Sequence, residues 1–204
     1  MYILFHSPYS QHARRVVSLL IEARLEYRLQ PIAMEKGEHL SPEYLAINPN
    51  HQVPTLVDGD IKIHESNAIL RYLCVKHGLA EWYPSDLAKR AAVEQWLDWN
   101  QCRLSPAVVD IVLNTVFLGD RGDPAAIERG RAKLRELEPL LDAALSGVDF
   151  VAGDRPTIAD LSLGSSVFQL GFAKVTPRGQ HTQRWFKRVN AIDGFQRSLP
   201  ERQS

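Results

Sequence analysis

The spacing of apolar and polar positions in residues 1–78 predicts a small α/β unit. Tyr2–Phe5 is a short apolar run that ends at His6-Ser7-Pro8, which is typical of a buried strand. Apolar residues then recur every three or four positions from about Ser10, and this predicts an amphipathic helix. Glu26–Ile32 is predicted to be a second strand. A strand, a helix and a strand in about 30 residues form a βαβ unit, so the two strands should be parallel.

A short helix, a hairpin and a further helix are predicted to follow. Ser41-Pro42 combines a helix-capping serine with a proline at the first helical position. Asp58-Gly59-Asp60 lies between two short apolar runs and is an Asp-Gly signal for a β-hairpin. The next helix is expected over Glu65–His77, with Gly78 placed to end it. This order, βαβ, a short helix and ββα, is that of a thioredoxin-like domain.

The rest of the chain has a helical pattern. Residues 86–118 are expected to form one long helix, and residues 125–145 another, after a break at Gly119–Pro124. Thr157-Ile158-Ala159-Asp160 is similar to a capping box and should begin a third helix. The body of this helix, residues 161–170, contains small side chains that suit a central helix approached closely by its neighbours.

These patterns predict two domains. A thioredoxin-like α/β domain should cover residues 1–78, and an all-helical domain should cover residues 86–204. Residues 79–85, which contain Pro84, are the expected linker. A length of 204 residues suits two such domains better than one core.

Charge and cysteine content exclude several function classes. Lys plus Arg and Asp plus Glu both number 24, whereas a nucleic-acid-binding protein normally has a basic excess. Cys74 and Cys102 are too few and too far apart for a disulfide framework or a metal cluster, and both are expected to be small buried side chains. The first ten residues fit neither a signal peptide nor a membrane span. We therefore expect a cytoplasmic protein with no metal, no membrane and no nucleic acid as partner.

Residues 7–12 are the first candidate for chemistry. Ser10 should lie at a helix N-terminus, where unpaired backbone N–H groups and the positive end of the helix dipole stabilise a thiolate. The alternative is that Ser10 only caps the helix.

Two further segments carry polar groups at structurally special positions. Pro54 precedes an extended apolar stretch, so it either opens a strand or forms a cis bond that exposes the backbone of Val53 to an extended peptide. Glu65 and Ser66 stand at a predicted helix start. They are either ordinary capping residues, or they bind the ammonium and the carboxylate of an α-amino acid.

The three segments occur in an order and spacing that resemble the cytosolic glutathione S-transferase family, and the resemblance covers the whole chain. Gln52–Leu56 and Glu65–Leu73 look like the glutathione site of that family. Gly37–Ser41 is similar to theta-class enzymes, and Gly153–Asp160 resembles the family's structural capping motif.

The resemblance implies a role for each site residue. The backbone of Val53 pairs with the cysteinyl residue of glutathione, with Pro54 cis. Glu65 and Ser66 hold the γ-glutamyl end. The glycyl carboxylate is reached by Gln52 and His39.

The same resemblance places Ser10 beside the glutathione thiol. Comparison with beta-class and zeta-class enzymes puts Ser10 at the position of their cysteine and serine, whereas a tau-like match favours Ser7. Tyr9 is a further rival. No tyrosine stands where alpha, mu and pi enzymes have one.

The implied reaction is attack of the thiolate on a small hydrophobic electrophile bound between the domains of a homodimer. Its candidate pocket residues are Tyr9, His12, Trp99, Asn100 and Leu104. Core packing is an equal alternative for Trp99 and Leu104.

The sequence is also compatible with other functions of this fold. Glutathione-dependent peroxidase or isomerase chemistry remains open, as does a non-catalytic regulatory module with the same fold. An intact Glu65-Ser66 pair argues against the module. A disulfide reductase needs a thiolate nucleophile, and Ser10 stands where it would be.

Overall fold

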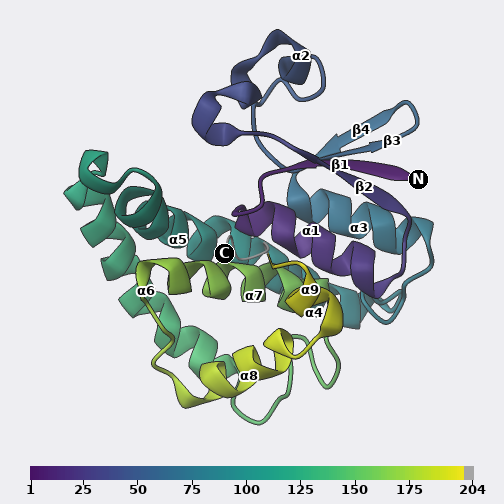
Figure 1. Ribbon diagram of the computed structural model, residues 1–204. Coiled ribbons are helices and arrows are strands. Elements are labelled where there is room, and N and C mark those ends of the chain that lie inside the picture. The colour runs from purple at the N-terminus through teal and green to yellow at the C-terminus, as the bar shows by residue number, and fades with distance from the viewer. Residues whose placement is uncertain (200–204) are drawn as a thin grey trace. The chain divides into compact units, whose positions relative to one another are not determined.

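The computed structural model describes residues 1–199, which divide into two compact units. The first unit comprises residues 1–80 together with the C-terminal segment from Ile192, and the second comprises residues 81–191. The first boundary falls inside the predicted linker, residues 79–85. Figure 1 colours the chain from purple to yellow, so both parts of the first unit can be followed.

A four-stranded sheet forms the centre of the first unit, which confirms the thioredoxin-like prediction. The strands are β1 (Tyr2–His6), β2 (Tyr27–Pro31), β3 (Thr55–Asp58) and β4 (Ile61–His64). Their order is β2-β1-β3-β4. As predicted, β1 and β2 are parallel and β3 and β4 form an antiparallel hairpin. Leu4 pairs with Leu56 across β1 and β3, and both are fully buried.

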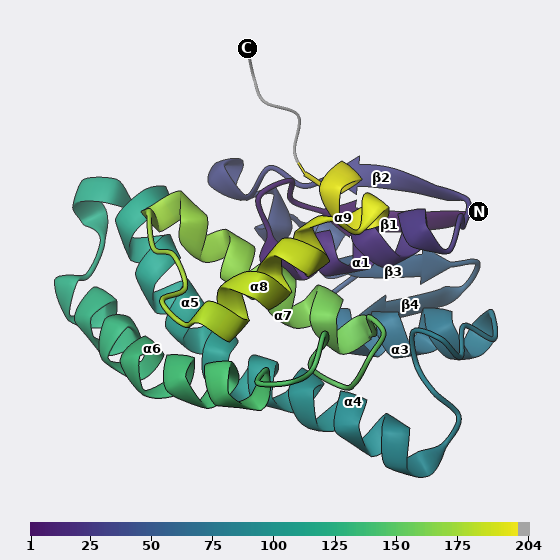
Figure 2. The same cartoon turned by 90° about the horizontal axis from the view of Figure 1, so that it is seen from below.

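Helices α1 (Gln11–Glu22) and α3 (Ser66–Lys76) cover one face of this sheet (Figures 1 and 2). Their apolar faces are buried at Val16, Leu20 and Ile69, which the helical spacing predicts. Between β2 and β3 lie the short turns η1 (Met34–Lys36) and η2 (Glu38–Leu40) and the helix α2 (Pro42–Leu45). Ser41 caps α2 as predicted, because its side chain accepts the Tyr44 N–H at 3.2 Å.

The last helix, α9 (Asp193–Arg197), departs from the predicted domain division. The sequence analysis placed it in the helical domain, whereas in the structure it packs on α1 in the first unit. Gly194 permits this approach, because a Cβ there would lie 2.4 Å from the Ser18 carbonyl oxygen. The Arg14 guanidinium donates to the Phe195 carbonyl at 3.0 Å and lies 3.9 Å from the centroid of the Phe195 ring.

The second unit is all-helical, as predicted. Its main helices are α4 (Leu87–Trp99), α5 (Ser105–Val112), α6 (Pro124–Ala144), α7 (Ile158–Leu170) and α8 (Gln180–Asn190). The predicted helix over residues 86–118 is interrupted by two π-helical segments, η3 (Asn100–Leu104) and η4 (Leu113–Phe117). Short 3-10 turns, η5 (Gly119–Arg121) and η6 (Gly171–Ala173), follow η4 and α7.

Helix α7 is the buried centre of the second unit, as its small side chains suggested. It begins with a complete capping box, in which Asp160 accepts the Thr157 N–H at 2.8 Å. The fully buried Asp160 carboxylate also accepts the Val151 N–H and the Trp185 indole N–H, each at 2.9 Å. Burial raises the pKa of Asp160, and these hydrogen bonds oppose the rise. The motif therefore ties α7 to α8 and to the preceding loop.

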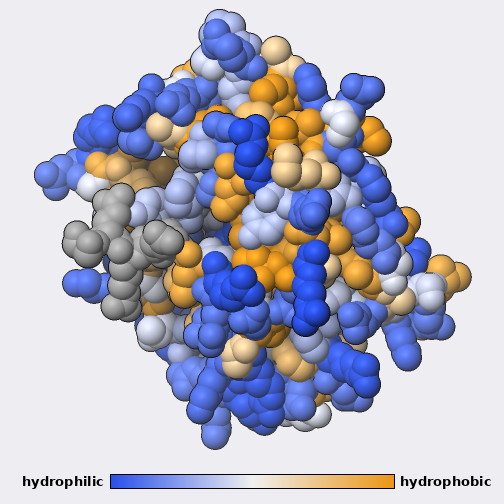
Figure 3. All heavy atoms as spheres, turned by 45° about the vertical axis from the view of Figure 1, so that its right-hand side comes forward, coloured by the Kyte–Doolittle hydropathy of each residue, from blue (hydrophilic) through white to orange (hydrophobic). Residues whose placement is uncertain are grey.

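The surface mixes polar and apolar side chains. On the face drawn in Figure 3, apolar patches lie between hydrophilic residues.

Cys74 is buried as expected, but Cys102 is exposed, so the prediction for Cys102 was wrong. Burial raises the pKa of Cys74 to about 12. Among the described residues, no helix is both long and apolar enough to cross a bilayer.

Candidate functional site

Ser10 lies in the turn between β1 and α1. Its backbone is extended, and its Oγ accepts the Ala13 N–H at 3.2 Å, so Ser10 is the N-cap of α1. Within residues 1–199 the hydroxyl makes no other hydrogen bond, which leaves its own proton for a ligand. The Ser10 N–H donates to the Ser7 carbonyl at 3.0 Å, and Tyr9 is 44% exposed. Ser10 can therefore cap α1 with its oxygen and donate its hydroxyl proton to a ligand at the same time.

Helix α1 also carries two buried arginines close to this turn in the sequence. Burial lowers the pKa of Arg14 and of Arg15 to about 9, so both guanidinium groups stay charged at neutral pH. Burial, aided by the charge of Arg15, lowers the pKa of His12 to about 3. At neutral pH the first two turns of α1 therefore contain two fixed positive charges and an uncharged imidazole.

The segment before β3 is held by a buried hydrogen-bond network. The Tyr44 hydroxyl donates to the Gln52 carbonyl at 2.5 Å, and the Asn48 amide donates to the same oxygen at 2.9 Å. Asn48 also donates to Thr55 Oγ1 at 3.0 Å. The Val53–Pro54 bond is cis, as the resemblance implied. Within residues 1–199 neither the N–H nor the C=O of Val53 has a hydrogen-bond partner, which suits pairing with a bound peptide.

Glu65 has an unusual backbone conformation at the start of α3. Its φ is 66° and its ψ is 106°, a combination that non-glycine residues rarely adopt. Its side chain is exposed, and within residues 1–199 its carboxylate has no partner. Such a conformation costs about 1–3 kcal/mol and is concentrated at functional sites. It leaves the carboxylate of Glu65 available for a ligand.

The next two residues of α3 are buried against Arg15. Ser66 is 4% exposed, and the Arg15 guanidinium lies 3.5 Å from Ser66 Oγ and 3.2 Å from Asn67 Oδ1. The N-terminus of α3 therefore brings together the N–H groups of its first turn, a serine hydroxyl and a nearby buried cation. An anion is stabilised there, and the neighbouring Glu65 carboxylate favours a cation. This is the charge pattern of an α-amino acid.

His51 lies near both side chains expected at the glycyl carboxylate, His39 and Gln52. The ring centroids of His39 and His51 are 6.4 Å apart. Gln52 Nε2 lies 3.5 Å from His51 Nδ1. Sequence reasoning gave His51 no role, although it directly precedes Gln52 in the matched motif. The structure thus groups His39, His51 and Gln52 on one side of the loop.

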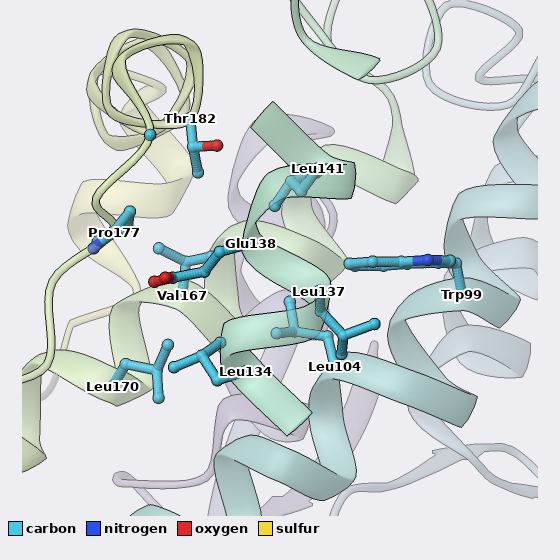
Figure 4. A pocket seen from close by; sticks show the side chains of 11 residues that line it. Trp99, Leu104, Leu134, Leu137, Glu138, Leu141, Val167, Leu170, Pro177 and Thr182 are labelled. Atoms are coloured by element: carbon cyan, nitrogen blue, oxygen red, sulfur yellow. The ribbon is translucent and has the colours of Figure 1, made fainter. Parts of the chain in front are cut away.

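The five residues expected at an electrophile pocket are divided between the two units. Tyr9 and His12 belong to the first, and Trp99, Asn100 and Leu104 belong to the second. Asn100 is fully buried and donates to Ser162 Oγ at 2.9 Å. Trp99 and Leu104 line a small, almost wholly apolar cavity within the helical unit (Figure 4). This position agrees with the alternative that Trp99 and Leu104 pack in the core of the helical unit.

Across the described part of the chain, no group of three or more His, Cys, Asp or Glu side chains is arranged to hold a metal ion.

Comparison with known proteins decides the family. The profile "Glutathione S-transferase, N-terminal domain" matches residues 1–74, and "Glutathione S-transferase, C-terminal domain" matches residues 124–188. The chain belongs to the glutathione S-transferase family. It is 32% identical to glutathione S-transferase F10 of Arabidopsis thaliana over 200 residues, which covers 94% of this chain and 93% of the relative. It is 36% identical to glutathione S-transferase 2 of Anopheles gambiae over 178 residues, 84% and 82% of the two chains.

A solved structure agrees with these relatives. The theta-class glutathione S-transferase of Xanthomonas axonopodis pv. citri, determined with glutathione bound, superposes on this transferase with a TM-score of 0.88. The identity is 29%, and the match covers 97% of this chain and 96% of the other. The function of this chain is therefore that of a glutathione transferase.

Proposed function

We propose that this transferase binds glutathione in the first unit, from the N-terminus of α3 to the loop at Gln52, and activates its thiol with Ser10. The observation that carries the proposal is the start of α3. There the exposed carboxylate of Glu65 is held at a strained backbone position, next to a buried serine and the first-turn N–H groups of α3. No role in the described fold requires this combination.

Each part of glutathione has a complementary group in this site. Glu65 pairs with the γ-glutamyl ammonium, and Ser66 with the N–H groups of α3 binds the γ-glutamyl carboxylate. The free N–H and C=O of Val53 pair with the cysteinyl backbone. Gln52 and His39 bind the glycyl carboxylate.

Activation of the thiol follows from the position of Ser10. A cysteine-like thiol has a pKa of about 8.5, so only a few per cent is ionised at neutral pH. A hydrogen bond donated by Ser10 and the N–H groups at the start of α1 favour the thiolate. A pKa lowered by about two units corresponds to about 2.7 kcal/mol. The thiolate then attacks the electrophile directly, and no covalent enzyme intermediate is required.

The electrophile is proposed to be a small hydrophobic molecule. The exposed Tyr9 and the uncharged His12 are its first candidate contacts, because both flank Ser10. Trp99, Asn100 and Leu104 remain secondary candidates. A panel of an aryl halide, an organic hydroperoxide, an alkyl halide and a maleylacetoacetate-like substrate separates transfer from peroxidase and isomerase chemistry. No turnover of any of them, with glutathione still bound, would favour the non-catalytic module.

The proposed assembly is a homodimer in the cytoplasm. Ile61 and Val75 of the first unit are 50% and 68% exposed, which is unusual for large apolar side chains and suits an interface. Light scattering on the purified chain tests this, and a monomeric mass would contradict it. The two free cysteines suit a reducing compartment.

A further inference from the structure

A second cavity lies entirely within the helical unit. It has a volume of about 280 Å³. One wall is a face of α6, and the other is the segment that joins α7 to α8 and runs beside α6 (Figure 2). No residue assigned to glutathione belongs to it.

The lining of this cavity is strongly cationic. Arg131 and Arg135 come from α6, and Lys174 and Arg178 come from the joining segment. Glu138 is the one acidic residue among the lining residues, although the whole chain has a net charge of zero. Arg135 forms a salt bridge with Glu128 at 2.8 Å. Within residues 1–199 the other three cations form no salt bridge, although Arg131 interacts electrostatically with Glu128 and Arg178 with Glu138.

Lys174 ends η6 at the edge of this cavity. Its φ is 57° and its ψ is 29°, the left-handed conformation that commonly ends a helix and favours glycine. A lysine in this conformation costs roughly 1 kcal/mol that a glycine would avoid.

Glu138 lines the cavity together with Arg178. Burial raises the pKa of Glu138, and the charge and backbone N–H of Arg178 oppose this rise. Leu134 and Glu138 also line the apolar cavity of Figure 4, so an apolar wall continues beneath the cations.

We propose that this cavity binds a small organic phosphate. The phosphate group is held by Arg131, Lys174 and Arg178, and the organic part lies on Leu134. Guanidinium and ammonium groups are the side chains that bind phosphate best. A volume of about 280 Å³ is far more than one water molecule needs, so the cavity has room for an organic group beside the phosphate.

Calorimetry on the full chain at low ionic strength tests the proposal, with phenyl phosphate as the probe. Saturating S-methylglutathione keeps the glutathione site occupied, so failure of that site and failure of this one are distinguishable. We expect saturable binding of one phenyl phosphate per chain, tighter than that of inorganic phosphate. Arg131→Gln and Arg178→Gln should each weaken it about fivefold, and Glu138→Gln should strengthen it.

The matched control is Arg129→Gln, which removes the same charge from α6 outside the cavity. It should leave the affinity within about twofold. Absence of saturable binding at millimolar probe would overturn the proposal, as would an equal loss in Arg129→Gln. Displacement of the probe by S-methylglutathione would assign the binding to the glutathione site instead. Inorganic phosphate binding as tightly as phenyl phosphate would refute the contact with Leu134.

Discussion

Replacing Glu65 by glycine should stabilise the fold and abolish most glutathione binding. The residue combines a φ of 66° with an exposed, unpaired carboxylate. Glycine tolerates a positive φ, whereas every other residue is strained there. The side chain contributes no described contact to the fold, so its removal costs the folded state little.

The backbone conformation of Glu65 and its lost ligand contact set the two expected effects. Relief of a rare backbone conformation returns about 1–3 kcal/mol, and the greater chain entropy of glycine in the unfolded state takes back about 0.5–1 kcal/mol. We expect Glu65→Gly to be more stable by about 1 kcal/mol. Loss of a charge-assisted contact to the γ-glutamyl ammonium costs about 1.5–3 kcal/mol, which weakens glutathione roughly ten- to a hundredfold.

Glu65→Ala separates the two effects. Alanine also lacks the carboxylate but keeps the strain, because its Cβ meets the same steric limits at positive φ. Glu65→Ala should therefore lose glutathione affinity as Glu65→Gly does, without the gain in stability. Urea unfolding measures the stability and calorimetry with glutathione measures the affinity.

Two results would refute this reasoning. Unchanged glutathione affinity in both variants would show that the carboxylate is not a ligand. Equal stability of the glycine and alanine variants would show that the φ of Glu65 carries no cost.

The remaining predictions concern three other residues. Ser10→Ala should lower turnover at neutral pH roughly tenfold or more while the KM for glutathione changes little, because the hydroxyl contacts only the thiol. Steady-state kinetics measures both quantities, and an equal loss of turnover in Ser7→Ala would contradict the assignment of this role to Ser10. Asp160→Ala should destabilise the fold by about 3 kcal/mol or more, since it removes the acceptor of four buried hydrogen bonds. Asp154→Ala, at an exposed aspartate, is the control in urea unfolding, and similar losses in both variants would contradict the role of the capping box. In the folded protein the pKa of His12 is lowered from 6.5 to about 3, so between these pH values the unfolded state binds more protons than the folded state. The free energy of unfolding should therefore fall as the pH falls from 6.5 toward 3. His12→Gln should lack this part of the acid sensitivity in urea unfolding, and an unchanged pH profile would exclude His12 as its source.

Local signals explain why the sheet and most helices were predictable. The Asp-Gly pair between β3 and β4, the serine-proline start of α2 and the capping box of α7 each act within a few residues. The parallel pairing of β1 and β2 follows from the short βαβ connection.

Long-range contacts explain what the sequence did not predict. The place of α9 depends on Arg14 bonding to Phe195 and Ser198, about 180 positions away in the chain. The π-helical segments η3 and η4 were not predicted, because the apolar spacing of residues 86–118 is that of an ordinary α-helix. Nothing local distinguishes the buried Cys74 from the exposed Cys102.

The candidate site was predictable in part. The hydroxyl of Ser10 and the start of α3 stood out by their positions, but each had an ordinary capping interpretation. The strained backbone of Glu65 has no signature in the sequence, because a glutamate is a usual residue near a helix start. The proximity of His39 and His51 required the fold of the intervening loop.

The most direct test of the account is the ionisation of the thiol of bound glutathione. Thiolate absorbance of the complex is followed against pH and compared with free glutathione under the same conditions. We expect the thiol pKa of the complex to lie about two units below the ordinary value of about 8.5. A bound thiol that titrates like free glutathione would contradict it.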